Sequence, residues 1–144
     1  MQIVKKKLES KIFIVRGCQV MLDSDLADIY KVDVKIFNQA IKRNIKRFPS
    51  SFRFQLSKKE WENLRSQFVT SSLSHGGRRY LPHVYTEQGV AMLASVLKSA
   101  IAIKVSIQII QAFVAMRKSY VQLEGVIQRI ENIESKNYKP IDED

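Results

Sequence analysis

Short apolar runs stand near the start of the chain, and apolar residues recur at helical spacing further along. Two short β-rich runs, at 12–15 and 19–22, predict a β-hairpin. Residues that commonly cap helices stand before the two segments that follow, which predicts helices at about 25–31 and 34–47. Only a three-residue turn, 31–33, separates them, so the pair has the outline of a helix-turn-helix.

The rest of the chain alternates strands and helices. Apolar residues alternate with arginine and glutamine at 52–56, as in a half-buried strand. Pro82 lies inside the predicted strand at 80–85 and indicates that this strand is at the edge of a sheet. The segment 69–79 is rich in Ser, Thr and Gly, which predicts a loop or hairpin tip. In chain order we expect a strand at 52–56, a helix at 57–66, a strand at 80–85, and helices at 86–98 and 99–135.

These elements predict an α+β fold. It would contain an N-terminal β-hairpin, a helix-turn-helix-like helix pair, a second hairpin with a wing-like loop, and a long C-terminal helix. The chain has 144 residues, which fits one domain plus a short extension. We expect a DNA-binding domain at 1–119 and a helical extension at 120–144, because the sign of the net charge changes near Tyr120.

The second helix of the pair has an apolar face and a cationic face. At 100° per residue, one stripe consists of the apolar residues Val34, Phe37, Ile41, Ile45 and Phe48. The opposite stripe consists of Lys35, Gln39, Lys42, Arg43 and Lys46. An ordinary lysine-rich surface helix is the alternative, but such helices usually carry acids at i,i+4 spacing and this face has none. The cationic face therefore favours double-stranded DNA, whose phosphates suit Lys and Arg and whose base edges suit Arg and Gln.

Positive charge is concentrated in the middle of the chain. The net charge is +10, and 35–59 holds eight basic residues and no acid, whereas 120–144 is net acidic. Such a basic body indicates a polyanionic partner, and a merely solvated surface is the alternative. Arg78 and Arg79 follow two glycines in a predicted flexible tip. Such a tip would rest on the DNA backbone or in the minor groove, and a solvated turn without a partner is the alternative.

Four segments of the chain carry a family resemblance over roughly 14–118. They are LDSDLADIYKVDVKIFNQAIKRNIKRFPSSFRFQL, KKEWENLRSQ, GGRRYLPHVYTEQGVAMLASVL and IQIIQAFVAMRK. In these segments the chain resembles the N-terminal DNA-binding domain of phage antirepressor-type proteins, the ORF-six N-terminal domain, which is related to the KilA-N domains. The resemblance implies a winged-helix-like DNA binder of prophage or bacterial origin. Family members usually have glycine at the position of Lys31, where a left-handed backbone would cost lysine about 1 kcal/mol.

A heptad seam runs along the predicted C-terminal helix. Apolar residues alternate in spacing between four and three at Ile109, Phe113, Met116, Tyr120, Leu123, Ile127 and Ile130. We expect the first part of this seam to pack into the domain core and the part from Tyr120 to Ile130 to form a homodimer. Fraying of the second part is the alternative, and Gly125 inside the seam counts against the dimer by up to about 1 kcal/mol.

No residue cluster points to catalysis or to a cofactor. His75 and His83 are the only histidines and Cys18 is the only cysteine, and none has a partner at metal-ligand spacing. No pair of carboxylates suggests a nuclease metal site. The most apolar stretch, 101–116, is interrupted by polar residues, so we expect no membrane span. We therefore expect a cytoplasmic, non-enzymatic protein with no metal, no cofactor and no small-molecule substrate.

Two functions are compatible with these patterns. The first is a DNA-binding transcriptional regulator. Its phosphate contacts would come from Lys42, Lys46 and Arg79, and its base contacts from Lys35, Gln39 and Arg43. The alternative is a protein-interaction module, an antirepressor that binds a repressor protein through its C-terminal helix without reading DNA. An RNA-binding role is disfavoured because the sequence has no aromatic RNP-type strand and no GXXG clamp.

Overall fold

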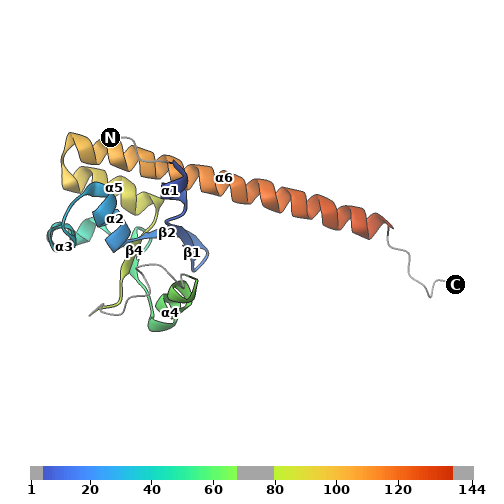
Figure 1. Cartoon of the computed structure of the whole chain (residues 1–144), viewed down its shortest axis with the longest axis horizontal. Helices are drawn as coiled ribbons and strands as arrows, with labels where there is room; N and C mark the ends of the chain where they lie inside the picture. The colour runs from blue at the N-terminus through green and yellow to red at the C-terminus, as the bar shows by residue number, and fades with distance from the viewer. Residues whose placement is uncertain (1–4, 68–79, 138–144) are drawn as a thin grey trace. The chain divides into compact units, whose positions relative to one another are not determined.

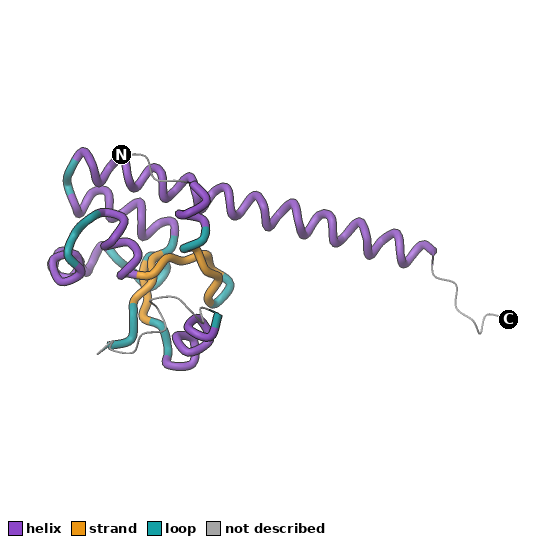
Figure 2. Tube along the Cα trace, in the orientation of Figure 1, coloured by secondary structure: helices purple, strands orange, loops and turns teal. Residues whose placement is uncertain are grey.

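The computed structural model describes residues 5–67 and 80–137. The chain divides into two compact units, one that ends at Phe113 and one that begins at Val114. In chain order the elements are α1 Lys5–Glu9, β1 Ile12–Val15, β2 Cys18–Leu22, α2 Asp23–Tyr30, α3 Val34–Arg43, the 3-10 turn η1 Ile45–Arg47, β3 Arg53–Gln55, α4 Lys58–Ser66, β4 His83–Tyr85, α5 Glu87–Leu97 and α6 Ala100–Asn137 (Figures 1 and 2). The predicted α+β fold, with its N-terminal hairpin, helix pair and long C-terminal helix, is confirmed.

A four-stranded antiparallel sheet forms the centre of the first unit, in the order β1-β2-β4-β3. Helices α2, α3 and α5 lie on one side of the sheet and α4 lies on the other (Figure 1). The α4 side is a small core in which Trp61 and Leu64 pack against Val20, Leu22 and Val84 of the strands. Because side chains alternate along a strand, residues next to these, such as those at 21, 83 and 85, face the other helices.

The hairpin between β1 and β2 turns in two residues. Arg16 and Gly17 both have positive φ, 54° and 74°, which is the type I′ geometry that suits the twist of a two-residue hairpin. The Arg16 Nε donates to a Glu60 carboxylate oxygen at 2.8 Å, and the guanidinium stacks 4.4 Å from the centre of the Phe54 ring. The hydrogen bond from Arg16 lowers the pKa of Glu60 to about 2. The hairpin turn is thereby fixed to the first turn of α4.

The capping residues predicted before α4 and α5 act as expected. Ser57 and Glu60 form a complete capping box at the start of α4. Before α5, the Thr86 side chain accepts from the Gly89 N–H at 3.3 Å and its hydroxyl donates to the Ser51 carbonyl at 2.8 Å. Thr86 therefore both begins α5 and ties it to the segment that leads into β3.

The prediction that β4 is an edge strand is wrong. The strand begins at His83, after Pro82, and pairs with β2 on one side and β3 on the other. Pro82 lies outside the ladder, where its missing N–H costs nothing, and its carbonyl accepts from the Leu56 N–H at 3.0 Å. The edges of the described sheet are β1 and β3.

The turn between α2 and α3 depends on Lys31. This residue ends α2 in the left-handed conformation, with φ 59° and ψ 44°, as a glycine does at this position of a helix. The Lys31 N–H donates to Asp28 and the Val32 N–H donates to Ala27, so the last carbonyls of α2 are satisfied. The departure from the family's glycine therefore leaves the left-handed turn in place, and lysine bears its cost.

Replacing Lys31 with glycine is expected to raise the free energy of unfolding by about 1 kcal/mol, because glycine adopts the left-handed conformation without the Cβ clash. Urea unfolding measures this change. Lys42→Gly is the matched control, since it places glycine at an exposed helical position of α3 and should lower stability by about 1 kcal/mol. A Lys31→Gly protein no more stable than the wild type would mean that the lysine side chain compensates for the strain.

Helix α6 meets the length and composition of a membrane-spanning helix. An 18-residue window within Ala100–Lys136 has a mean hydropathy of 1.5, and 33% of that window is buried. Ala102, Val105 and Ile109 on this helix are buried in the first unit, as in the core helix of a globular domain. Length and composition alone do not distinguish these two kinds of helix, so the absence of a membrane span stays a prediction.

Candidate nucleic-acid interface

Helix α3 is fixed to the rest of the first unit by its cap and by aromatic packing. The Asp33 side chain accepts from the Lys35 N–H at 2.8 Å and begins the helix. Phe37 is fully buried, and its ring meets the ring of Tyr85 edge to face, with centroids 5.8 Å apart. The opposite face of α3 is therefore held outward on a rigid support.

The predicted cationic residues lie together on this outward face. Lys35, Gln39, Lys42 and Arg43 are exposed on α3, and Lys46 is exposed on η1. Within 5–67 and 80–137, no hydrogen bond or ion pair engages any of these five side chains. Four exposed cations without an ion-pair partner form a surface of positive potential, which attracts polyanions.

Helix α3 is shorter than predicted. It ends at Arg43, where Asn44 leaves the helical conformation with φ −123° and its side-chain amide donates to the Ala40 carbonyl at 2.8 Å. The predicted apolar stripe is therefore only partly correct. Phe37, Ile41 and Phe48 are buried, but Val34 and Ile45 are exposed. Lys46 follows the break, so the cationic face bends at Asn44 instead of continuing straight along one helix.

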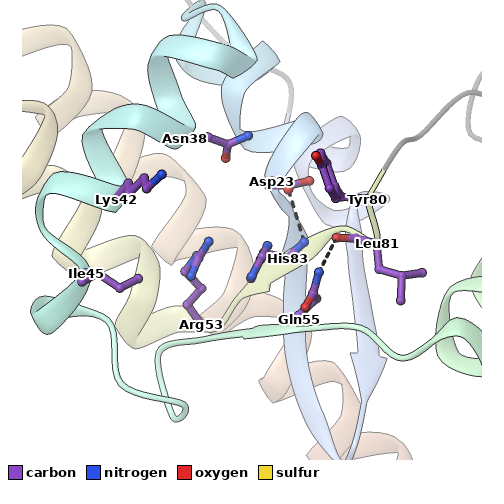
Figure 3. A pocket seen from close by; sticks show the side chains of 9 residues that line it. All are labelled: Asp23, Asn38, Lys42, Ile45, Arg53, Gln55, Tyr80, Leu81 and His83. Carbon is purple, nitrogen blue, oxygen red and sulfur yellow. Dashed lines mark hydrogen bonds between the residues drawn. The ribbon is translucent and has the colours of Figure 1, made fainter.

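An open groove of about 540 Å³ lies beside this face, between α3 and the strands β3 and β4 (Figure 3). Its residues come from α2, α3, η1, β3, β4 and the segment just before β4. They are Asp23, Asn38, Lys42, Ile45, Arg53, Gln55, Tyr80, Leu81 and His83. Lys42 belongs both to the cationic face and to the groove, so the two form one continuous surface.

Arg53 is the second cation of the groove and was missed as a site residue by sequence reasoning. Its Nε donates to the Tyr85 hydroxyl at 3.0 Å, and its guanidinium carbon lies 5.8 Å from the centre of the Tyr85 ring. Burial raises the pKa of Tyr85 to about 12, so the phenol stays neutral and keeps its hydroxyl at neutral pH. The sequence feature that could have identified Arg53 is the alternation of residues at 52–56, which places Arg53 and Gln55 on the face of the strand opposite Phe54.

Asp23 is the only acid that lines the groove among the described residues, and both of its carboxylate oxygens accept backbone hydrogen bonds. One accepts from the Ser24 N–H at 2.7 Å and the other from the His83 N–H at 3.2 Å. The Asp23 residue is only 4% exposed. Its charge is therefore directed at backbone N–H groups of α2 and β4. The accessible charges of the groove are those of Lys42 and Arg53.

Several predicted features lie outside the described residues or show no site. Arg78, Arg79 and His75 all fall within 68–79, as does the predicted wing-like loop, and the structure does not describe them. Cys18 is an exposed free cysteine. Within 5–67 and 80–137, no group of three His, Cys, Asp or Glu residues is placed to hold a metal ion.

The predicted heptad seam divides between the two units. Ile109 and Phe113 are buried in the first unit, as predicted for the first part of the seam. In the second unit, the predicted dimerisation residues are 43–55% exposed. They are Tyr120, Leu123, Ile127 and Ile130. Four large apolar side chains at heptad spacing on one helix form the kind of face that pairs with another helix.

Comparison with known proteins gives one match. The family model described as the ORF6N domain matches residues 10–96. This range covers β1 to α5 and so contains α3 and every residue that lines the groove. No curated protein and no solved structure matches the chain.

Proposed function

The chain belongs to the ORF6N domain family, and from this premise we propose that it is a cytoplasmic, non-enzymatic DNA-binding regulator of the phage antirepressor and KilA-N type. The observation that carries the proposal is the cationic face of α3 and η1, where the side chains of Lys35, Lys42, Arg43 and Lys46 are exposed and have no described partner. In helix-turn-helix proteins, the second helix of the pair enters the major groove of DNA. Helix α3 is the second helix of this pair.

The five residues of the face divide into two roles under this proposal. Lys42 and Lys46, towards the C-terminal end, hold backbone phosphates and fix the orientation of the domain. Lys35, Gln39 and Arg43 reach the edges of bases, where Arg suits guanine and Gln suits adenine. Arg79, outside the described residues, is proposed to add a phosphate contact.

Substitutions at Gln39 or Arg43 should differ in kind from a substitution at Lys46. Gln39→Ala and Arg43→Ala should each reduce discrimination at one base position by about 1–3 kcal/mol, because a bidentate base contact is lost. Lys46→Ala should weaken binding to all sequences alike. Affinities for a duplex selected from a random pool and for single-base variants of it measure both effects. If all three variants changed every sequence equally, the assignment of roles would be wrong.

We also propose that the protein acts as a homodimer through the second unit. The exposed residues from Tyr120 to Ile130 form two consecutive a/d pairs of a heptad repeat. A two-fold dimer of helix-turn-helix domains would contact two half-sites about 34 Å apart on one face of the duplex. The dimer would therefore add both affinity and a requirement on operator spacing.

Truncation after Lys118 should leave a folded first unit but weaken dimerisation, which light scattering and circular dichroism together can show. In the full chain, Leu123→Glu with Ile127→Glu should have the same effect, because two charges would be buried in the seam. Gln122→Glu with Gln128→Glu is the matched control on exposed positions of the same helix outside the a/d seam. The same oligomeric state for the wild type, the truncated chain and both double variants would refute dimerisation through the second unit.

A second function is favoured by one observation in the second unit. Val121, Val126 and Ile133 are also exposed, although they lie outside the a/d seam. A helix with this much exposed apolar surface also suits a protein partner. In this alternative, the chain is an antirepressor that binds a repressor through α6, and the cationic face of α3 makes no contact with DNA.

A further inference from the structure

We propose that the groove between α3 and the strands β3 and β4 binds one phosphate group of the DNA backbone, which Lys42 contacts from the α3 side and Arg53 from the β3 side. This inference rests on the proposed DNA binding and extends it to strand residues that no helix-turn-helix pattern includes. The contact would lie beside the base-reading part of α3, since Lys42 belongs to both surfaces.

Arg53 is already oriented for such a contact. Its Nε is bound to the buried hydroxyl of Tyr85, and its guanidinium is positioned beside the Tyr85 ring. No described residue accepts a hydrogen bond from its two terminal amino groups. Figure 3 shows the guanidinium directed into the groove. An arginine held by its Nε presents the other edge of the guanidinium, which has the planar geometry that binds phosphate oxygens.

Lys42 supplies the second cation of the proposed phosphate site, from the opposite wall of the groove. Its side chain extends from α3 into the same space, with its ammonium group towards the side of Arg53 and His83 (Figure 3). Two cations share the groove, and the one acid there is committed to backbone N–H groups. An anion bound between Lys42 and Arg53 would interact favourably with both cations, and no ion pair with a described residue engages either of them.

The lining suits a polymer backbone better than a small molecule. Pockets for small ligands enclose most of the ligand surface. Here Asn38, Gln55 and His83 add polar groups to the two cations, and Tyr80 is 73% exposed. The Gln55 amide already donates to the Leu81 carbonyl at 3.1 Å, so the wall is held in place. An open groove with two cations would let a phosphodiester chain pass while one phosphate is bound.

The salt dependence of duplex binding tests whether Lys42 and Arg53 bind one shared phosphate. Each phosphate neutralised contributes about −0.9 to the slope of log K against log salt concentration. Lys42→Gln and Arg53→Gln should each make the slope less steep by up to about 0.9, and the double variant should lose no more than about 0.9, because both residues hold the same phosphate. Arg53→Lys, which keeps the charge, should restore most of the slope. Thermal melting confirms that each variant is folded.

The outcomes separate this inference from the proposed function. If the wild type binds duplex with a steep slope and Arg53→Gln does not change it, the groove holds no phosphate and α3 alone binds DNA. If the slope of the double variant were less steep by about 1.8, Lys42 and Arg53 would bind two separate phosphates, and the proposal of one shared phosphate would be overturned. If inorganic phosphate raises the melting temperature only when Arg53 is present, while the duplex slope is unchanged, the groove binds free phosphate instead of DNA. A wild type without salt-dependent duplex binding would refute both proposals.

Discussion

Substitution of both Lys42 and Lys46 with glutamate is expected to lower the affinity for duplex DNA by about 100-fold or more. Each lysine is proposed to make a charge-assisted hydrogen bond to a phosphate, and two such bonds at about 1.5 kcal/mol each correspond to about 3 kcal/mol, or about two powers of ten in Kd. The new carboxylates would also repel the DNA. Both positions are exposed and have no described partner, so the fold should be unaffected.

Lys58 and Lys59 provide the control for this charge reversal. They belong to the same acid-free stretch of sequence, but they lie exposed on α4, on the other side of the sheet from α3. Glutamates there would even be favoured by the N-terminal end of that helix. Lys58→Glu with Lys59→Glu changes the net charge equally and should alter the affinity only slightly. An equal loss in both double variants, measured by fluorescence anisotropy, would mean that net charge and not the α3 face attracts DNA.

Substitution of Gly89 with alanine is expected to lower the free energy of unfolding by about 2–3 kcal/mol, although alanine is the better helix former. A methyl group at this position of α5 would collide with the carbonyl oxygen of Phe52 and lie 3.1 Å from its carbonyl carbon. That oxygen also accepts from the Thr86 N–H at 3.0 Å, so the backbone there cannot easily move away. Urea unfolding followed by circular dichroism gives the change.

Gly125 is the matched control, because it is also a helical glycine and a methyl group there meets no atom within 4 Å. Gly125→Ala should leave the stability of the first unit unchanged and increase the helicity of α6. The close approach at Gly89 positions the chain between Pro49 and Phe52, which leads directly to Arg53. If Gly89→Ala were as stable as the wild type, α5 would not lie against this segment, and the support of the groove would have to be different.

The elements predicted correctly are those with local signals. Asp33, the Ser57–Glu60 box and Thr86 mark helix starts within a few residues of chain, and all three cap helices in the structure. The cap predicted at Asp23 or Ser24 is wrong, because α2 already begins at Asp23 and has no side-chain cap. The exposure of the α3 cations also follows from the helical period of the neighbouring residues. Capping hydrogen bonds and the helical period depend on residues that are only a few positions apart, so they can be recognised directly in the sequence.

The features that escaped prediction depend on contacts between distant residues. Arg53 lines the same groove as Lys42 only because the sheet register pairs β3 with β4 and places Tyr85 beneath α3. Helix α1 has a single apolar residue, Leu8, which gives no periodicity, yet this side chain is buried. The end of α3 is set by Asn44, whose side chain bonds to the helix backbone, an outcome that helical periodicity does not reveal.

Binding of labelled duplex DNA, measured by fluorescence anisotropy over a series of salt concentrations, tests the central claim most directly. Random duplex and single-stranded RNA serve as competitors. Tight binding with a slope equivalent to several phosphates, against which RNA competes poorly, is the result expected of a DNA-binding face on α3. Absence of binding even at low salt would contradict it. The net charge of +10 would then serve solubility, and the exposed apolar residues of α6 would become the surface on which to seek a protein partner.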